Sequence, residues 1–112
     1  MVCNAQNLDN KVKPSADRIL GIIGLTKADA NSYGRVGIRI NAICPGYVKT
    51  PLLMNIMSRD PDSPLAVDLA RTPLKRLATM EEVADAIVQL ASPINSYLQG
   101  ASMICDGGFT SN

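Results

Sequence analysis

The spacing of apolar positions predicts a helix followed by a strand in the first half of the chain. Between residues 15 and about 33, apolar side chains recur every three or four positions, as one buried helix stripe requires. Gly34 comes next, and glycine accepts the left-handed conformation that ends many helices. The β-rich run 37–46 ends in Pro45-Gly46, which is typical of a strand followed by a turn.

The next stretch predicts two short helices separated by prolines. Apolar positions indicate helices at about 52–59 and 65–70. Pro61 and Pro64 interrupt the pattern, so we expect this part of the chain to be loop-like. The segment 72–76 is interpreted as a surface connection.

A capping box and a last strand are expected near the end of the chain. Thr79 followed by Glu82 has the capping-box spacing, which predicts a helix start. The apolar stripe that follows should fade at Ser92-Pro93. The run 101–105 then predicts a final strand.

This order of elements predicts an α/β fold with parallel strands joined by crossover helices. A parallel sheet is normally covered by helices on both faces, and about two strands leave much apolar surface without cover. We therefore expect residues 15–112 to be part of a doubly wound, Rossmann-like parallel sheet that is incomplete. Residues 1–14 show no clear period and are expected to form an irregular lead-in.

The charge balance and the absence of certain residues exclude several classes of function. Eleven basic residues nearly balance ten acidic ones, so neither nucleic acid nor a membrane surface is expected as a partner. No apolar run predicts a membrane span and the start lacks the order of a signal peptide, so we expect a cytoplasmic protein. The chain has no histidine, which disfavours Ser-His-Asp hydrolases, and its three cysteines are widely spaced with no CxxC pair, which disfavours a zinc site or a disulfide framework.

Several runs resemble one known family. Gly24-Leu25-Thr26-Lys27 and the run 37–51, GIRINAICPGYVKTP, are similar to the centre of short-chain dehydrogenases/reductases. The similarity continues in family order through Pro73-Leu74-Lys75-Arg76, Glu81-Glu82-Val83-Ala84, Leu90-Ala91-Ser92, Gly100 and Asp106-Gly107-Gly108. It covers about residues 20–110, the C-terminal half of the family's domain, and residues 28–34 are most similar to members from filamentous fungi.

The resemblance implies an NAD(P)-dependent oxidoreductase that interconverts a carbonyl and an alcohol on a small-molecule substrate, in fungi often in secondary-metabolite biosynthesis. It also implies cofactor-binding residues: Pro45 and Gly46 shape the nicotinamide wall, the Val48 backbone meets the carboxamide, and the Thr50 hydroxyl donates to the carboxamide or a phosphate. From the residues alone, Pro45-Gly46 is also an ordinary turn and Thr50 an ordinary cap before Pro51.

Other polar residues in the matched runs also have structural interpretations. Asn41 is expected to be a hydrogen-bonded amide in the core. The triplet 106–108 is interpreted as an ordinary turn, and Lys75 and Arg76 as solvated charges.

No catalytic residue is predicted in this chain. The resemblance implies a tyrosine with a lysine four residues later, but counting back from Gly24 places Ser15 and Ile19 at those positions. A shift by one residue gives Pro14 and Arg18, and none of the three tyrosines has a lysine four positions on. A glycine-rich phosphate-binding turn is also missing. We therefore expect poor NAD(P) affinity and no turnover.

Two hypotheses are consistent with these features. The first is an oxidoreductase family member present as a truncated chain, or as the product of a mispredicted first exon, without catalysis. The second is a non-catalytic binding module that forms a homo-oligomer or pairs with a full-length relative through the helix 15–33 and the last strand. We expect the substrate and the preference between NAD and NADP to depend on the upstream half and on residues 52–71.

Overall fold

The computed structural model describes residues 13–60 and 62–111, and gives side-chain surroundings from residue 20 onward. The elements follow the expected order: α1 (Lys13–Tyr33), the 3-10 helix η1 (Gly34–Val36), β1 (Ala42–Pro45), α2 (Pro51–Arg59), α3 (Pro64–Arg71), α4 (Met80–Ala91), η2 (Pro93–Asn95), β2 (Ser102–Cys105) and η3 (Phe109–Ser111). Helix α1 begins slightly earlier than expected, at Lys13. The rest of the expected lead-in, residues 1–12, lies outside the described residues.

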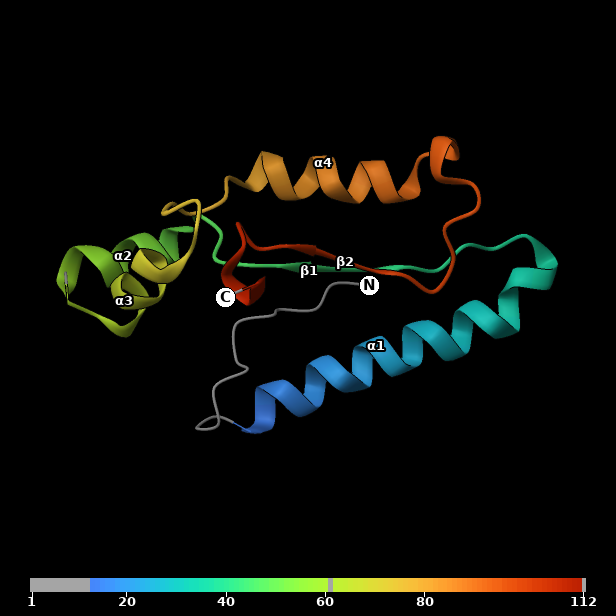
Figure 1. Cartoon of the computed structure of the whole chain (residues 1–112), viewed down its shortest axis with the longest axis horizontal. Coiled ribbons are helices and arrows are strands. Elements are labelled where there is room, and N and C mark those ends of the chain that lie inside the picture. The colour runs from blue at the N-terminus through green and yellow to red at the C-terminus, as the bar shows by residue number, and fades with distance from the viewer. Residues whose placement is uncertain (1–12, 61, 112) are drawn as a thin grey trace.

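The two strands form a parallel sheet. Ala42 of β1 is opposite Ser102 of β2, and Pro45 is opposite Cys105. Figure 1 shows α4 on one face of this sheet and α1 on the other, in three layers. The expected α/β fold, a partial doubly wound parallel sheet, is confirmed.

The core lies between the sheet and α4. Ile43 of β1 packs with Ala86 and Leu90 of α4, and Met103 and Cys105 of β2 cover this cluster. Because alternate residues of a strand point to opposite faces, Ile43, Met103 and Cys105 can all turn toward the same helix.

On the opposite face, α1 contacts β1 through its buried stripe. Thr26 and Ala30 of this helix are buried. The Thr26 hydroxyl donates to the Ile22 carbonyl at 2.8 Å, so this buried polar group has a partner within its own helix.

Much apolar surface is exposed, as two strands led us to expect. Ile104 of β2 is 58% exposed, so the side of this strand turned away from the α4 core is only partly covered. Other large apolar side chains that are exposed are Leu20, Leu25, Ile87, Val88, Ile94 and Tyr97.

The first strand is shorter than the predicted run 37–46. Gly37 adopts a left-handed conformation with φ of 78° and closes η1. The backbone N–H of Ile40 donates to the Gln99 side chain at 2.8 Å. Because the Ile40 N–H is bonded to the Gln99 side chain and not to the backbone of β2, regular pairing between the strands begins only at Ala42.

The two short helices expected at about 52–59 and 65–70 are confirmed as α2 and α3, so this stretch is mostly helical and not loop-like as a whole. Pro51 and Pro64 each lie in the first turn of a helix, α2 and α3 respectively, where a missing backbone N–H costs nothing. Pro64 therefore starts a helix instead of breaking the chain. The expected surface connection 72–76 is wrong at Thr72, which is buried and donates from its hydroxyl to the Asp68 carbonyl at 3.0 Å.

Helix α4 has the predicted start. The Thr79 hydroxyl accepts from the Glu82 N–H at 3.1 Å, and the Glu82 carboxylate accepts from the Thr79 N–H at 2.8 Å, which confirms the capping box. In the described residues, no helix combines the length and apolar character needed to cross a bilayer.

Candidate functional site

The carboxyl ends of β1 and β2 lie together at the end of the sheet that faces α2 and α3 (Figure 1). In open parallel sheets, ligands bind beyond this edge, in the crevice between the loops that leave the strands. Residues 46–50 leave β1 there, and residues 106–111 leave β2 beside them. The four expected cofactor-binding residues, Pro45, Gly46, Val48 and Thr50, therefore belong to one continuous segment at this edge.

Gly46 packs directly against the loop that leaves β2. Its N–H donates to the Cys105 carbonyl at 2.9 Å, which extends the parallel ladder by one bond past Pro45. A Cβ at Gly46 would lie 2.7 Å from the Cα of Asp106, too close for any side chain. Both Pro45 and Gly46 are buried, so the turn is a packed part of the sheet.

Val48 forms an isolated parallel bridge with Ala78. The two hydrogen bonds of this bridge are made by the residues on either side of Val48. The Lys49 N–H donates to the Ala78 carbonyl at 2.7 Å, and the Ala78 N–H donates to the Tyr47 carbonyl at 2.9 Å. The Val48 N–H itself points away from Ala78 and has no acceptor among the described residues. It is a backbone donor available to a ligand.

Thr50 caps α2. Its side-chain oxygen accepts from the Leu53 N–H at 3.4 Å, as the structural interpretation expected. A hydroxyl also carries one hydrogen to donate. Capping therefore leaves that hydrogen for an acceptor on a ligand, and the two interpretations of Thr50 are compatible.

Tyr47 makes contacts that the sequence did not predict. Its hydroxyl donates to the Asp68 carboxylate at 2.6 Å, and its ring meets Phe109 edge to face, with centroids 5.9 Å apart. Burial, and then the hydrogen bond to Asp68, raise the pKa of Tyr47 well above its ordinary value. Tyr47 therefore stays protonated at neutral pH and remains the donor in its hydrogen bond to Asp68.

Asp106 organises the loop after β2. Its carboxylate accepts from the Thr110 hydroxyl at 2.6 Å, from the Thr110 N–H at 2.9 Å and from the Gly108 N–H at 2.9 Å. Burial disfavours the charged form, but these hydrogen bonds outweigh it and the pKa of Asp106 lies below its ordinary value. The triplet 106–108 is thus more than an ordinary turn.

Arg76 was expected to be a solvated charge. It is exposed, but it also has an ion-pair partner. Its guanidinium forms a two-pronged ion pair with Glu82, at 2.6 and 2.9 Å. A small cavity of about 110 Å³ lies beside this pair, and Gly46, Tyr47 and Cys105 contribute to its lining. Pockets for drug-sized ligands and cofactors measure roughly 300–1,000 Å³, so this cavity is too small to hold a dinucleotide.

The other expectations concern positions at the start of α1 and metal binding. Ser15 and Ile19 both lie in α1, but their side chains lie outside the described part of the structure. Among the described residues, no group of histidine, cysteine or acidic side chains is arranged to hold a metal.

The chain is similar to known oxidoreductases. A family model described as enoyl-(acyl carrier protein) reductase matches residues 19–110. Oxidoreductase UcpA of Salmonella typhimurium is 46% identical over 93 residues, which cover 80% of this chain and 35% of that protein. Short-chain dehydrogenase anuF of Penicillium roqueforti is 36% identical over 110 residues, which cover 96% of this chain and 39% of that protein.

A solved structure extends the similarity to the fold. ElxO with NADP bound superposes with a TM-score of 0.84 at 27% identity, over 99% of this chain and 46% of that chain. This chain therefore spans about a third of the length of the curated relatives it matches and about half of the solved structure.

Proposed function

The chain belongs to the short-chain dehydrogenase/reductase family, and from this premise we propose that residues 45–50 form the nicotinamide-facing wall of an NAD(P)-dependent oxidoreductase. The reaction would interconvert a carbonyl and an alcohol on a small-molecule substrate. The observation that carries the proposal is the Val48 N–H, which points away from its bridge partner Ala78 and lies two positions before Thr50 in the same segment.

The residues of this segment fit the cofactor chemically. The Val48 N–H and the Thr50 hydroxyl both donate, and a carboxamide oxygen or a phosphate oxygen accepts. Gly46 and Pro45 give the segment a buried, packed base, which supports donors held in a fixed position. When bound, NAD(P) supplies the hydride transfer itself, while the protein orients it.

We propose further that this chain lacks turnover by itself. The positions implied for the tyrosine and lysine hold Ser15 and Ile19, and Tyr47 is held protonated by burial and Asp68. Losing a general acid/base typically costs about 10²- to 10⁴-fold in rate. Activity would require the tyrosine and the lysine to come from another chain or from a longer form of the protein.

Titration of the purified chain with NADPH and NADH, followed by nucleotide fluorescence, tests the wall. Thr50→Asp keeps a good helix cap but adds a negative charge near a phosphate, so we expect weaker binding by about tenfold or more. Thr50→Asn also caps and can still donate, so it should bind within a few-fold of the unaltered chain. Asn31→Asp adds the same charge on an exposed part of α1 and controls for net charge.

The proposed nicotinamide-facing wall is contradicted if the unaltered chain and the three variants bind the nucleotides with equal affinity. Absence of saturable binding by a monodisperse unaltered chain would also reject it. Size exclusion run beside the titration separates this outcome from aggregation.

The exposed apolar side chains favour a second candidate, a non-catalytic module that pairs with another copy or with a full-length relative. Large apolar side chains are exposed on both covering helices, such as Leu25 on α1 and Val88 on α4, and large exposed apolar patches mark protein interfaces. A defined oligomer in light scattering favours this candidate. A monodisperse monomer contradicts a homo-oligomer, and failure to co-purify with a co-expressed full-length relative contradicts the pairing.

A further inference from the structure

We infer that the hydrogen bond between Tyr47 and Asp68 is a latch that holds α3, and α2 with it, beside the carboxyl end of the sheet. Tyr47 would thereby act as a positioning residue for the segment 45–50. The structural part of this inference stands on the geometry of Tyr47. Its consequence for nucleotide binding rests on the function proposed above.

The position of α2 and α3 makes such a latch necessary. Figure 1 shows both helices beyond the end of the sheet, outside the layers formed by α1, the strands and α4. Leu65 is the one buried apolar residue in either helix, so burial alone contributes little to holding them in place. A specific contact across the junction has a correspondingly large effect on their position.

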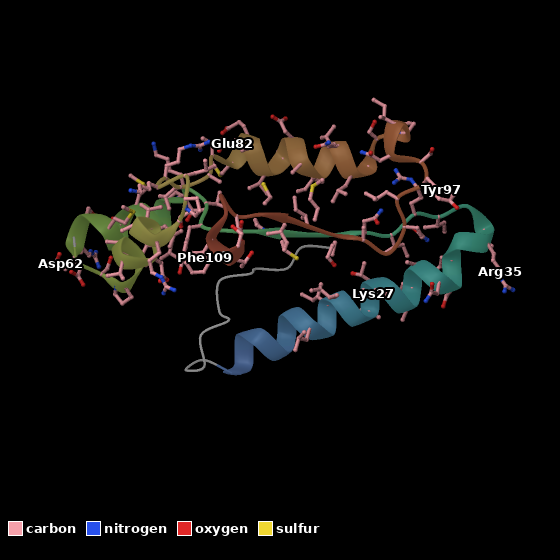
Figure 2. The ribbon with its side chains drawn as sticks, viewed as in Figure 1. Lys27, Arg35, Asp62, Glu82, Tyr97 and Phe109 are labelled. Atoms are coloured by element: carbon pink, nitrogen blue, oxygen red, sulfur yellow. The ribbon has the colours of Figure 1, made fainter. Side chains whose placement is uncertain are left out.

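Tyr47 is anchored on the sheet side by two contacts. Its carbonyl accepts from the Ala78 N–H at 2.9 Å, and its ring packs edge to face on Phe109. Figure 2 shows Phe109 at the end of the sheet nearest α2 and α3. Gly46, which precedes Tyr47 in the chain, packs directly against Asp106. The backbone from which the Tyr47 side chain extends is therefore held in place as well.

Asp68 is anchored on the helix side. It lies in the last turn of α3, and its carbonyl accepts both the N–H and the hydroxyl of Thr72 at 3.0 Å. Thr72 is buried, and its methyl group lies 3.1 Å from where a Cβ on Gly107 would be. The 2.6 Å bond from the Tyr47 hydroxyl therefore joins two fixed points, at a length typical of a hydroxyl bound to a carboxylate.

Tyr47 also faces the small cavity at the strand ends. Tyr47 and Thr72 line it together with Gly46 and Asp106. A movement of α3 away from Tyr47 would open this cavity and free the side chain next to Val48. The latch thus couples the placement of α2 and α3 to the donors proposed for the nicotinamide.

Hydrogen exchange of the full chain, read by mass spectrometry, tests the latch without any ligand. Tyr47→Phe keeps the ring and its contact with Phe109 but removes the hydroxyl. Exchange in residues 51–71 should become about tenfold faster, as expected for losing one hydrogen bond to a charged group, while α1 and α4 are unchanged. Tyr97→Phe is the matched control, because Tyr97 is fully exposed.

Changes at Asp68 separate a latch from a general loss of stability. Asp68→Asn retains an acceptor for the Tyr47 hydroxyl and should stay close to the unaltered chain, whereas Asp68→Leu should match Tyr47→Phe. The double variant Tyr47→Phe/Asp68→Leu should be no faster than either single variant, because both remove the same bond. Faster exchange along the whole chain, or none in residues 51–71, overturns the latch.

The nucleotide measurement is kept separate. If Tyr47→Phe releases α2 and α3 and weakens NADPH binding about three- to tenfold, both proposals are supported. Local release in a chain that binds no nucleotide keeps the latch and rejects the wall at residues 45–50. Nucleotide binding with unchanged exchange in residues 51–71 keeps the wall and rejects the latch.

Discussion

A Cβ atom placed on Gly46 would lie 2.7 Å from the Cα of Asp106. The loops that leave β1 and β2 therefore touch backbone to backbone, at the edge where we propose that the nicotinamide binds. The φ of Gly46 is not in the left-handed region, so the requirement for glycine here comes from space and not from backbone conformation. This contact sets how closely the two strand ends approach.

Gly46→Ala should lower the free energy of unfolding by about 1–3 kcal/mol, because the methyl group meets backbone atoms that cannot turn aside. Urea denaturation measures the loss. Gly24→Ala is the matched control: its Cβ meets nothing, and alanine in the middle of α1 should stabilise by about 0.5–1 kcal/mol. Equal stability of Gly46→Ala and the unaltered chain would show that the loops can separate freely.

Arg39→Met should destabilise the carboxyl end of α4. The Arg39 guanidinium donates to the carbonyls of Leu90 at 3.0 Å and Ala91 at 2.9 Å, and to further carbonyls in residues 92–98. A cation at this end also complements the helix dipole. We expect a loss of about 2 kcal/mol in urea denaturation, since methionine keeps the apolar stem but donates nothing.

Arg35→Met is the control for the Arg39 variant. Arg35 is exposed in η1 (Figure 2), and its replacement by methionine removes the same positive charge. It should change stability by less than about 0.5 kcal/mol. If the two variants lose the same stability, net charge and not the carbonyl cluster accounts for the effect.

Stability should fall as the pH is lowered from about 5 to about 2, in part through Glu82. The hydrogen bonds from Arg76, and then from the Thr79 N–H, lower the pKa of Glu82 from 4.5 to about 2. A carboxylate with a lowered pKa in the folded state stabilises above its unfolded pKa, and this contribution is lost as the pH falls through the folded value.

Glu82→Gln should therefore be less stable than the unaltered chain at pH 6, and the difference between the two should shrink toward pH 2. Urea midpoints measured across this range provide the comparison. Because the ion pair is exposed, added salt should reduce the difference at pH 6. A difference that does not depend on pH would mean that Glu82 acts through packing or helix propensity alone.

The elements that depend on near neighbours could be predicted from the sequence. The stripe that forms α1 and the capping box at Thr79 are local patterns, and their hydrogen bonds join residues three or four positions apart. The parallel sheet also followed, because a strand, a crossover helix and a second strand permit few arrangements. The segment 45–50 was correctly expected at a strand's carboxyl end for the same reason.

Tertiary structure decided the contacts that join distant parts of the chain. Tyr47 and Asp68 are 21 positions apart, and Arg39 reaches carbonyls more than 50 positions away. The Ile40 N–H donates to the side chain of Gln99, 59 positions away, and β1 is therefore shorter than the sequence predicted. A side-chain donor gives no periodic signal for its acceptor, so the sequence determined which elements form, and only packing determined which of their ends meet.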